Sequence, residues 1–220
     1  MFVGHYGPSF AAKGIRNFIP LWVLFIAAQL LDVFWSVFVL LGIEKLRIVP
    51  GITATNPFDL YYMPYTHSLV GATIIAIGTA TGYYLFRSAD GWVPATLVGA
   101  TVFSHWVLDV LVHRPDMPLY DNSYKIGFGL WNYPIFAFVL ELVVLFSGLY
   151  LYLKTTQSTS RIGRYGMVTF GFIVLVVQAI VFFGPPLTST RATAVTALFW
   201  YFLFAGVVSW LERKRGPRNV

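Results

Sequence analysis

Residues 104–118 read SHWVLDVLVHRPDMP, and this stretch decides how the rest of the chain is interpreted. His105, Asp109 and His113 follow one another at four-residue steps, so an α-helix places them on one narrow stripe. The residues between them are mostly apolar, as is the run 94–103 before them. The pattern predicts a helix in a membrane. Burying ionisable groups there without partners is costly, so the stripe indicates a functional site.

The composition indicates the class of protein. Of 220 residues, 57% are hydrophobic and 11% are charged, whereas a soluble domain has roughly 25% charged residues. The expected fold class is therefore all-α, a polytopic membrane helix bundle with about six spans of about 20 residues each. The chain contains no cysteine, so a metal would need imidazole and carboxylate ligands.

The hydropathy pattern predicts where the spans lie. Apolar runs occur at about 19–43, 67–86, 94–113, 133–153, 165–183 and 192–211. The third is expected to end at His113, because Pro115 disfavours helical conformation at Arg114. The last two carry few polar residues and are predicted to be structural.

One integral membrane domain is expected over residues 1–220. It is divided into a site-bearing part at about 1–145, structural helices at about 146–212 and a basic tail at 213–220.

The residues before the first span, 1–18, are too short and too interrupted to cross a membrane. No small-residue cleavage site follows an apolar core, so they do not read as a removable signal peptide. Residues 2–13 are predicted to form a short re-entrant helix, which is tolerated at membrane depth when protein surrounds it. A return through residues 14–20 would bring His5 close to Asp32.

The distribution of Lys and Arg predicts the orientation. These residues are more frequent on the side of the six spans that holds both ends of the chain. Both termini are therefore predicted to be cytoplasmic, in a prokaryotic inner (plasma) membrane, which places His67 near the outer face. The basic residues are scattered among loops, so the expected partners are bilayer lipids, with no nucleic acid.

Several short motifs occur in a fixed order over roughly the first 145 residues. They are Gly4-His5, Asp32 after an apolar run, THSL at 66–69 and SHWVLD at 104–109. This order resembles the inner-membrane metal-dependent hydrolase family that includes LexA-binding members. The resemblance implies a metal site and, through the family's label, a hydrolase.

Two positions depart from that family's pattern. The family tends to carry a doubled acidic motif where this chain has Asp32 followed by Val33, and a His-Arg pair where Pro64 and Tyr65 precede THS.

The residue types themselves suit a transition metal. Imidazole and carboxylate groups bind zinc, the expected metal, and also manganese, iron or nickel. The predicted ligands are His5, Asp32, His67, His105 and Asp109. The predicted catalytic residues are His113, Asp116 and Glu141, with Glu141 or Asp116 as general base. The expected reaction is hydrolysis of a lipid phosphoester or ester by a metal-activated water.

Other classes of function remain open at this point. A proton- or ion-coupled small transporter also uses buried His, Asp and Glu, but residues 1–110 and 111–220 show no internal repeat. A non-catalytic membrane partner protein would leave the His/Asp stripe without a purpose. The structural alternatives for single residues are a hydrogen-bonded His105–Asp109 pair, an interfacial His67, a solvated His5, and a Glu141 bonded to Gln178 or a serine.

Overall fold

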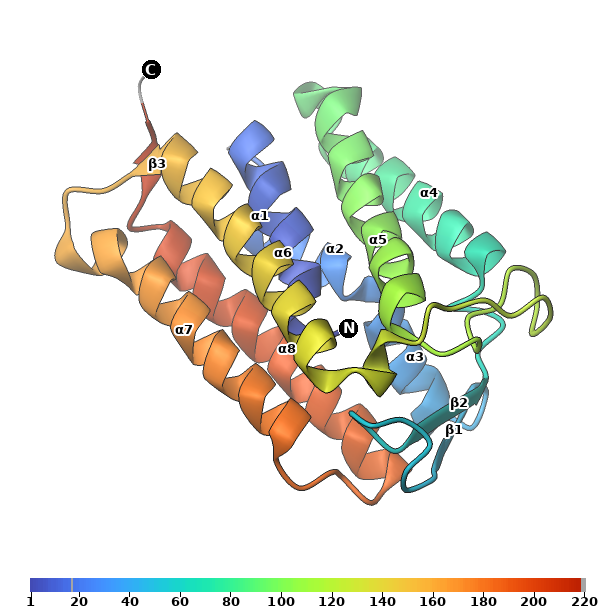
Figure 1. Ribbon diagram of the computed structural model, residues 1–220. Coiled ribbons are helices and arrows are strands. Elements are labelled where there is room, and N and C mark those ends of the chain that lie inside the picture. Colours follow the sequence, from blue (N-terminus) through green and yellow to red (C-terminus); the bar gives the residue numbers. More distant parts are fainter. Residues whose placement is uncertain (17, 219–220) are drawn as a thin grey trace.

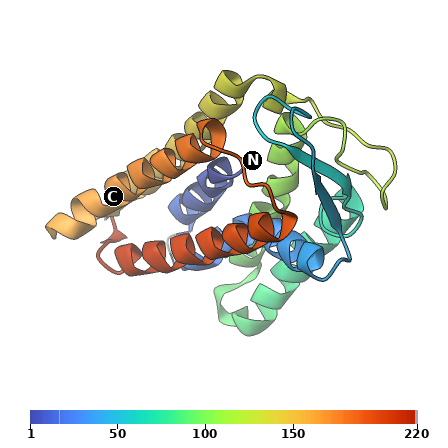
Figure 2. The same ribbon diagram turned by 90° about the horizontal axis from the view of Figure 1, so that it is seen from below.

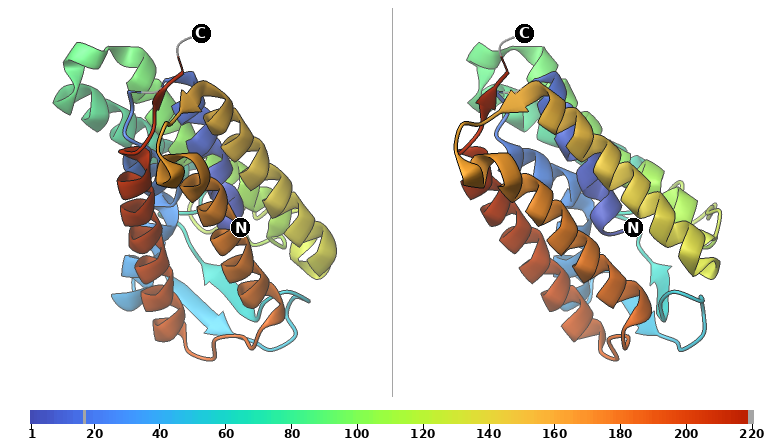
Figure 3. Two further views of the ribbon diagram at one scale, coloured as in Figure 1. Left: turned by 90° about the vertical axis from the view of Figure 1, so that its left-hand side faces the viewer. Right: turned by 60° about the vertical axis from the view of Figure 1, so that its left-hand side comes forward.

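The computed structural model describes residues 1–16 and 18–218, and the chain is a bundle of helices (Figure 1). Within these residues, five helices are long and apolar enough to cross a membrane: α4 (Leu69–Phe86), α5 (Trp92–Val112), α6 (Pro134–Thr155), α7 (Arg161–Phe183) and α8 (Thr190–Glu212). In Figure 3, α6, α7 and α8 run side by side, while α4 packs on α5. The predicted helical bundle is confirmed, and the apolar helices fit an integral membrane protein.

The first predicted span is broken. It consists of α2 (Leu21–Ala28) and α3 (Leu30–Leu40), which are bent by 53° at a break around Gln29. The prediction of one continuous helix over 19–43 is therefore wrong, although counting the bent pair as one span keeps the total at six. Gln29 is buried and donates its side-chain N–H to the carbonyl oxygen of Phe2, 2.9 Å away. The break thus lies where the N-terminal segment meets this span.

The N-terminal segment lies inside the bundle, as Figures 1 and 2 show. It begins with a short 3-10 helix, η1 (Val3–His5), and continues as α1 (Tyr6–Ile15), in which Tyr6 and Phe10 are fully buried. The short helix predicted within 2–13 is therefore present, and the longer helices surround it. Because η1 packs against α5 and α6, His5 is carried into the bundle interior.

The depth of α1 is set by a close crossing with α6. A Cβ atom added at Gly148 would lie 2.1 Å from the carbonyl oxygen of Gly7, and one added at Gly7 would lie 2.3 Å from the carbonyl oxygen of Val144. Such distances leave no room for a side chain, so glycine is required on both helices. Small residues allow helix backbones to approach in this way inside membranes.

Replacing Gly148 with alanine is therefore expected to push α1 away from α6 and lower stability by about 1–3 kcal/mol, the usual cost of overpacking. Thermal unfolding in detergent would measure the change. The matched control is Gly206→Ala on α8, where an added Cβ meets open space. Equal unfolding temperatures for the two variants would contradict the close crossing.

Polar contacts join α1 and the start of α2 to the end of α8. Lys13 forms an ion pair with Glu212 at the end of α8 and donates to the carbonyl oxygen of Ile19, 2.7 Å away. The same Glu212 carboxylate accepts the backbone N–H of Leu21 at 2.8 Å. The last helix therefore contacts both α1 and the start of α2.

The long connection between α3 and α4 contains an antiparallel hairpin. Its strands are β1 (Lys45–Ile48) and β2 (Phe58–Tyr62), with Lys45 opposite Tyr62. The remaining short elements are η2 (Ser88–Asp90), η3 (Leu130–Asn132), β3 (Thr156–Gln157) and β4 (Gly216–Pro217), of which the last two pair with each other. The hairpin and the α7–α8 connection lie at the same end of the bundle (Figure 1).

Candidate metal centre

The five predicted metal ligands meet at one place inside the bundle. His5 comes from η1, Asp32 from α3 and His67 from the residues just before α4, while His105 and Asp109 lie one turn apart on α5. Asp32 is partly buried and the other four are buried. The alternatives of a solvated His5 and an interfacial His67 therefore do not describe this structure.

Four of these side chains present one atom each at closely similar spacings. His67 Nε2 lies 3.3 Å from Asp32 Oδ1 and 3.7 Å from Asp109 Oδ2. His105 Nε2 lies 3.6 Å and 3.2 Å from the same two oxygens. Bonds of about 2.0–2.2 Å from zinc to four tetrahedral ligands separate the ligand atoms by about 3.3–3.6 Å. The four nitrogen–oxygen separations thus lie close to this range, and one ligand atom each from Asp32, His67 and His105 lies within 4.8 Å of the other two.

The tautomer of His105 follows from its hydrogen bond. Its Nδ1 lies 2.7 Å from the carbonyl oxygen of Ala28, the last residue of α2. A carbonyl oxygen only accepts, so Nδ1 carries the hydrogen and a neutral ring has its lone pair on Nε2. His105 is fully buried, and this Nε2 has no hydrogen-bond partner within residues 1–16 and 18–218. A free lone pair therefore faces the carboxylates.

The tautomer of His67 is fixed by two residues. The Thr66 hydroxyl donates to Glu44 Oε2 at 2.6 Å, so its oxygen accepts from His67 Nδ1 at 2.7 Å. Glu44 is buried and also accepts the backbone N–H groups of Tyr65 and Thr66 at 2.9 and 3.0 Å. His67 Nε2 is therefore left to face Asp32 and Asp109. Holding the outer ring nitrogen in this way is typical of metal-binding histidines.

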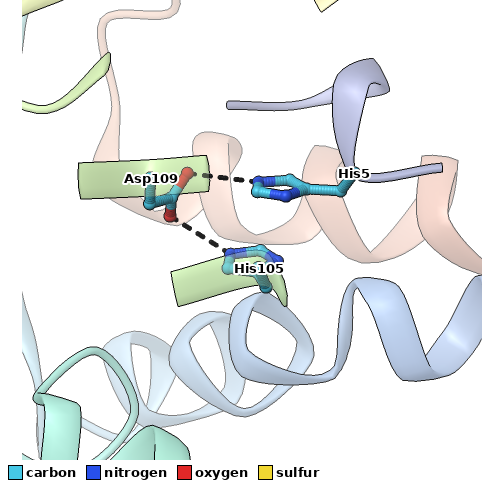
Figure 4. A group of neighbouring side chains, drawn as sticks. All are labelled: His5, His105 and Asp109. Carbon is cyan, nitrogen blue, oxygen red and sulfur yellow. Dashed lines mark hydrogen bonds and ion pairs between the residues drawn. The ribbon is translucent and has the colours of Figure 1, made fainter. Parts of the chain in front are cut away.

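His5 lies on the other side of Asp109. The His5 and His105 rings stack with centroids 3.7 Å apart and an interplanar angle of 8°. His5 Nε2 is 3.1 Å from Asp109 Oδ1, so the two rings approach different oxygens of the carboxylate (Figure 4). The amino group of Met1 also contacts Oδ1.

Glu141 holds the segment that carries His5. Its Oε2 accepts the backbone N–H groups of Phe2 and Gly4 at 3.0 and 3.1 Å. Glu141 is fully buried, and its Oε1 has no hydrogen-bond partner among the residues that the structure describes. The suggested hydrogen bonds from Gln178 or a serine are therefore wrong, because the backbone N–H groups of Phe2 and Gly4 are the donors to Glu141. Its role as a general base stays a prediction.

His113 and Asp116 form a pair at the edge of the cluster. Helix α5 ends at Val112, one residue earlier than predicted, and the extended backbone of His113 follows it. His113 Nδ1 lies 2.9 Å from Asp116 Oδ1, and its Nε2 lies 3.5 Å from Asp109 Oδ2. Burial lowers the pKa of His113, but the neighbouring carboxylates of Asp109 and Asp116 outweigh it and raise the pKa above its usual value.

Sequence reasoning missed Tyr201, because α8 was expected to be structural only. The Tyr201 hydroxyl donates to Asp32 Oδ2 at 2.6 Å, so α8 contributes directly to the cluster. An ionisable group within an apolar span stands out in a sequence, whereas a tyrosine does not. A tyrosine in the aromatic run FWYFLF looks the same whether its hydroxyl is buried or not.

A cavity of about 180 Å³ leads to the cluster. Cluster residues form its polar wall: Asp32, His67, Asp109, His113 and Tyr201. Most of the remaining wall is apolar and rich in aromatic rings, including Trp35, Phe58, Leu60, Trp131, Leu187 and Trp200. Thus the hairpin, η3 and α8 together build an apolar chamber next to the ionisable groups.

Comparison with protein-family models, with curated proteins and with solved structures gives no match. The function is therefore argued from the geometry of this site.

Proposed function

We propose that the protein is a membrane-embedded metal-dependent hydrolase that cleaves a lipid phosphoester or ester with a metal-activated water. Zinc is the expected metal. The single observation that carries the proposal is that His67 Nε2 and His105 Nε2 each lie within 3.7 Å of the same two carboxylate oxygens, Asp32 Oδ1 and Asp109 Oδ2. Both rings have their Nδ1 engaged elsewhere, so these nitrogens are available to a metal.

The residues divide into holders of the metal and groups that act beside it. The proposed ligands are Asp32, His67, His105 and Asp109. Bound zinc would lower the pKa of its water toward about 7 and so supply hydroxide at neutral pH. The general base was predicted to be Glu141 or Asp116; here Asp116 is proposed to act through His113, whose Nδ1 it contacts and whose Nε2 would take the proton from that water.

The cavity supports a substrate with an apolar part. A lipid could place its chain against the aromatic wall and its phosphoester or ester group at the polar wall. In the proposed orientation, with both termini in the cytoplasm of a prokaryotic cell, the hairpin end faces outward. The substrate would then come from the outer leaflet or the external solution.

A substrate screen tests the proposal. Purified protein would be stripped of metal, reloaded with zinc and incubated with phospholipids, lipid phosphates and lipid esters. Zinc-dependent turnover that His105→Ala abolishes is the expected result. If no substrate turns over, while liposomes show metal- or proton-coupled flux that Glu141→Gln abolishes, a transporter would replace the hydrolase.

Replacing Thr66 with valine is expected to weaken zinc binding by about 10- to 100-fold, as is usual when a contact that orients a metal ligand is lost. Valine keeps the shape of threonine but removes the hydroxyl that connects His67 to Glu44. Competition with a chelator would measure the affinity. In the control, Thr73→Val, the lost hydroxyl bonds the carbonyl oxygen of Leu69 in the same helix. Equal affinities in the two variants would show that Glu44 and Thr66 do not position His67.

A further inference from the structure

We propose that the centre holds two metal ions, bridged by the two oxygens of Asp109, with His5 as a ligand of the second ion. This inference rests on the proposed metal centre and extends it. The first position is the proposed site at Asp32, His67, His105 and Asp109 Oδ2. The second lies between His5 Nε2 and Asp109 Oδ1.

The stacking of two imidazoles carries the argument. A ring nitrogen binds a metal along its lone pair, which lies in the plane of the ring. The His5 and His105 rings are parallel within 8° and their centroids are 3.7 Å apart, so their lone pairs run in separate planes and do not converge on one ion. Two ions held in these planes would have a separation close to the roughly 3.5–4 Å of two-metal sites.

Asp109 supplies the bridge between the two positions. Its Oδ1 lies 3.1 Å from His5 Nε2, and its Oδ2 lies 3.2 Å from His105 Nε2 (Figure 4). Each ring is thus paired with its own oxygen.

The two positions are expected to differ in affinity. Hydrogen-bond acceptors hold Nδ1 of His67 and His105, whereas His5 Nδ1 is buried without a partner in the described part of the chain. Because such outer contacts typically change metal affinity by about 10- to 100-fold, the ion at His5 should be the weaker one.

Metal stoichiometry tests this inference on the full-length protein. After metal removal and titration with zinc, elemental analysis should find two ions per chain in wild type and one in His5→Phe, which keeps a ring stacked on His105. Loading with manganese adds a spectroscopic readout. Wild type should give an exchange-coupled paramagnetic resonance signal, and His5→Phe the six-line signal of isolated Mn²⁺.

The outcomes separate this inference from the proposed function. One ion in both proteins, with an uncoupled manganese signal in wild type, would overturn the second position and leave a mononuclear hydrolase. Two ions in both proteins would remove His5 from the ligand set. No ion in wild type would overturn the metal centre itself. The wild-type manganese signal decides the point even where His5→Phe fails to fold.

Discussion

Replacing Asp109 with asparagine is expected to abolish metal binding, lowering affinity by at least about 100-fold, beyond the loss typical of an indirect contact. Hydrolysis should fall to background with it. Asp109 is 2% exposed and faces the imidazoles of His5, His67, His105 and His113 within 3.7 Å. Asparagine keeps the size of the side chain but removes the negative charge that all four rings face.

The measurement is metal content and turnover on the same preparations. Asp90→Asn is the matched control, because Asp90 pairs with Arg87 outside the bundle interior, 3.0 Å away. The asparagine should fit at position 109, so the variant should still purify as a folded protein. Retention of a full metal load by Asp109→Asn would leave a structural or transport role for the cluster.

The part of the site that could be predicted is the part fixed by local geometry. A four-residue step places His105 and Asp109 on one face of any α-helix, whatever surrounds it. The depth of His5 was predicted from the lengths on either side of a turn. Both predictions depend only on the number of residues between two positions, which can be counted in the sequence.

The rest depends on packing between distant segments. Nothing local shows that Ala28 offers its carbonyl to His105, because that bond requires the break between α2 and α3. Gln29, a polar residue in an apolar run, was the available signal for the break. Glu44 lies in a loop of mixed composition, and its contact with Thr66 becomes visible only when the chain folds back over 22 residues.

The β1–β2 hairpin also has one feature that the sequence indicates and another that depends on contacts with distant segments. The alternation in Lys45–Ile48 is a strand signal, but four residues are too few to decide against a loop. Its role is set by tertiary contacts: Phe58 and Leu60 line the cavity, and Asp59 accepts from Arg47 at 2.6 Å. A loop between two spans thereby becomes part of the wall that the substrate would meet.

Replacing Asp116 with asparagine is expected to leave the metal bound and lower kcat by about 10²–10⁴-fold, the range for loss of a positioned general base. The Asp116 carboxylate can only accept, so whenever the His113 ring is neutral its hydrogen lies on Nδ1 and its lone pair on Nε2. An asparagine amide can donate to Nδ1 and so favour the opposite tautomer. His113 Nε2 would then carry a hydrogen and be unable to take one from water.

Measuring kcat, KM and zinc content separately distinguishes this role from a structural one. A structural role would change all three, whereas loss of the base lowers kcat alone. KM and the zinc load should be unchanged, because Asp116 is not among the proposed ligands. The control is Asp59→Asn, which breaks ion pairs with Arg47 and Arg114 in the same network but does not contact His113 in the structure as described. Loss of zinc from Asp116→Asn would place His113 among the groups that hold the metal. Full turnover with zinc bound would remove His113 as the base and return that role to Glu141, whose free Oε1 lies buried beside the segment that carries His5.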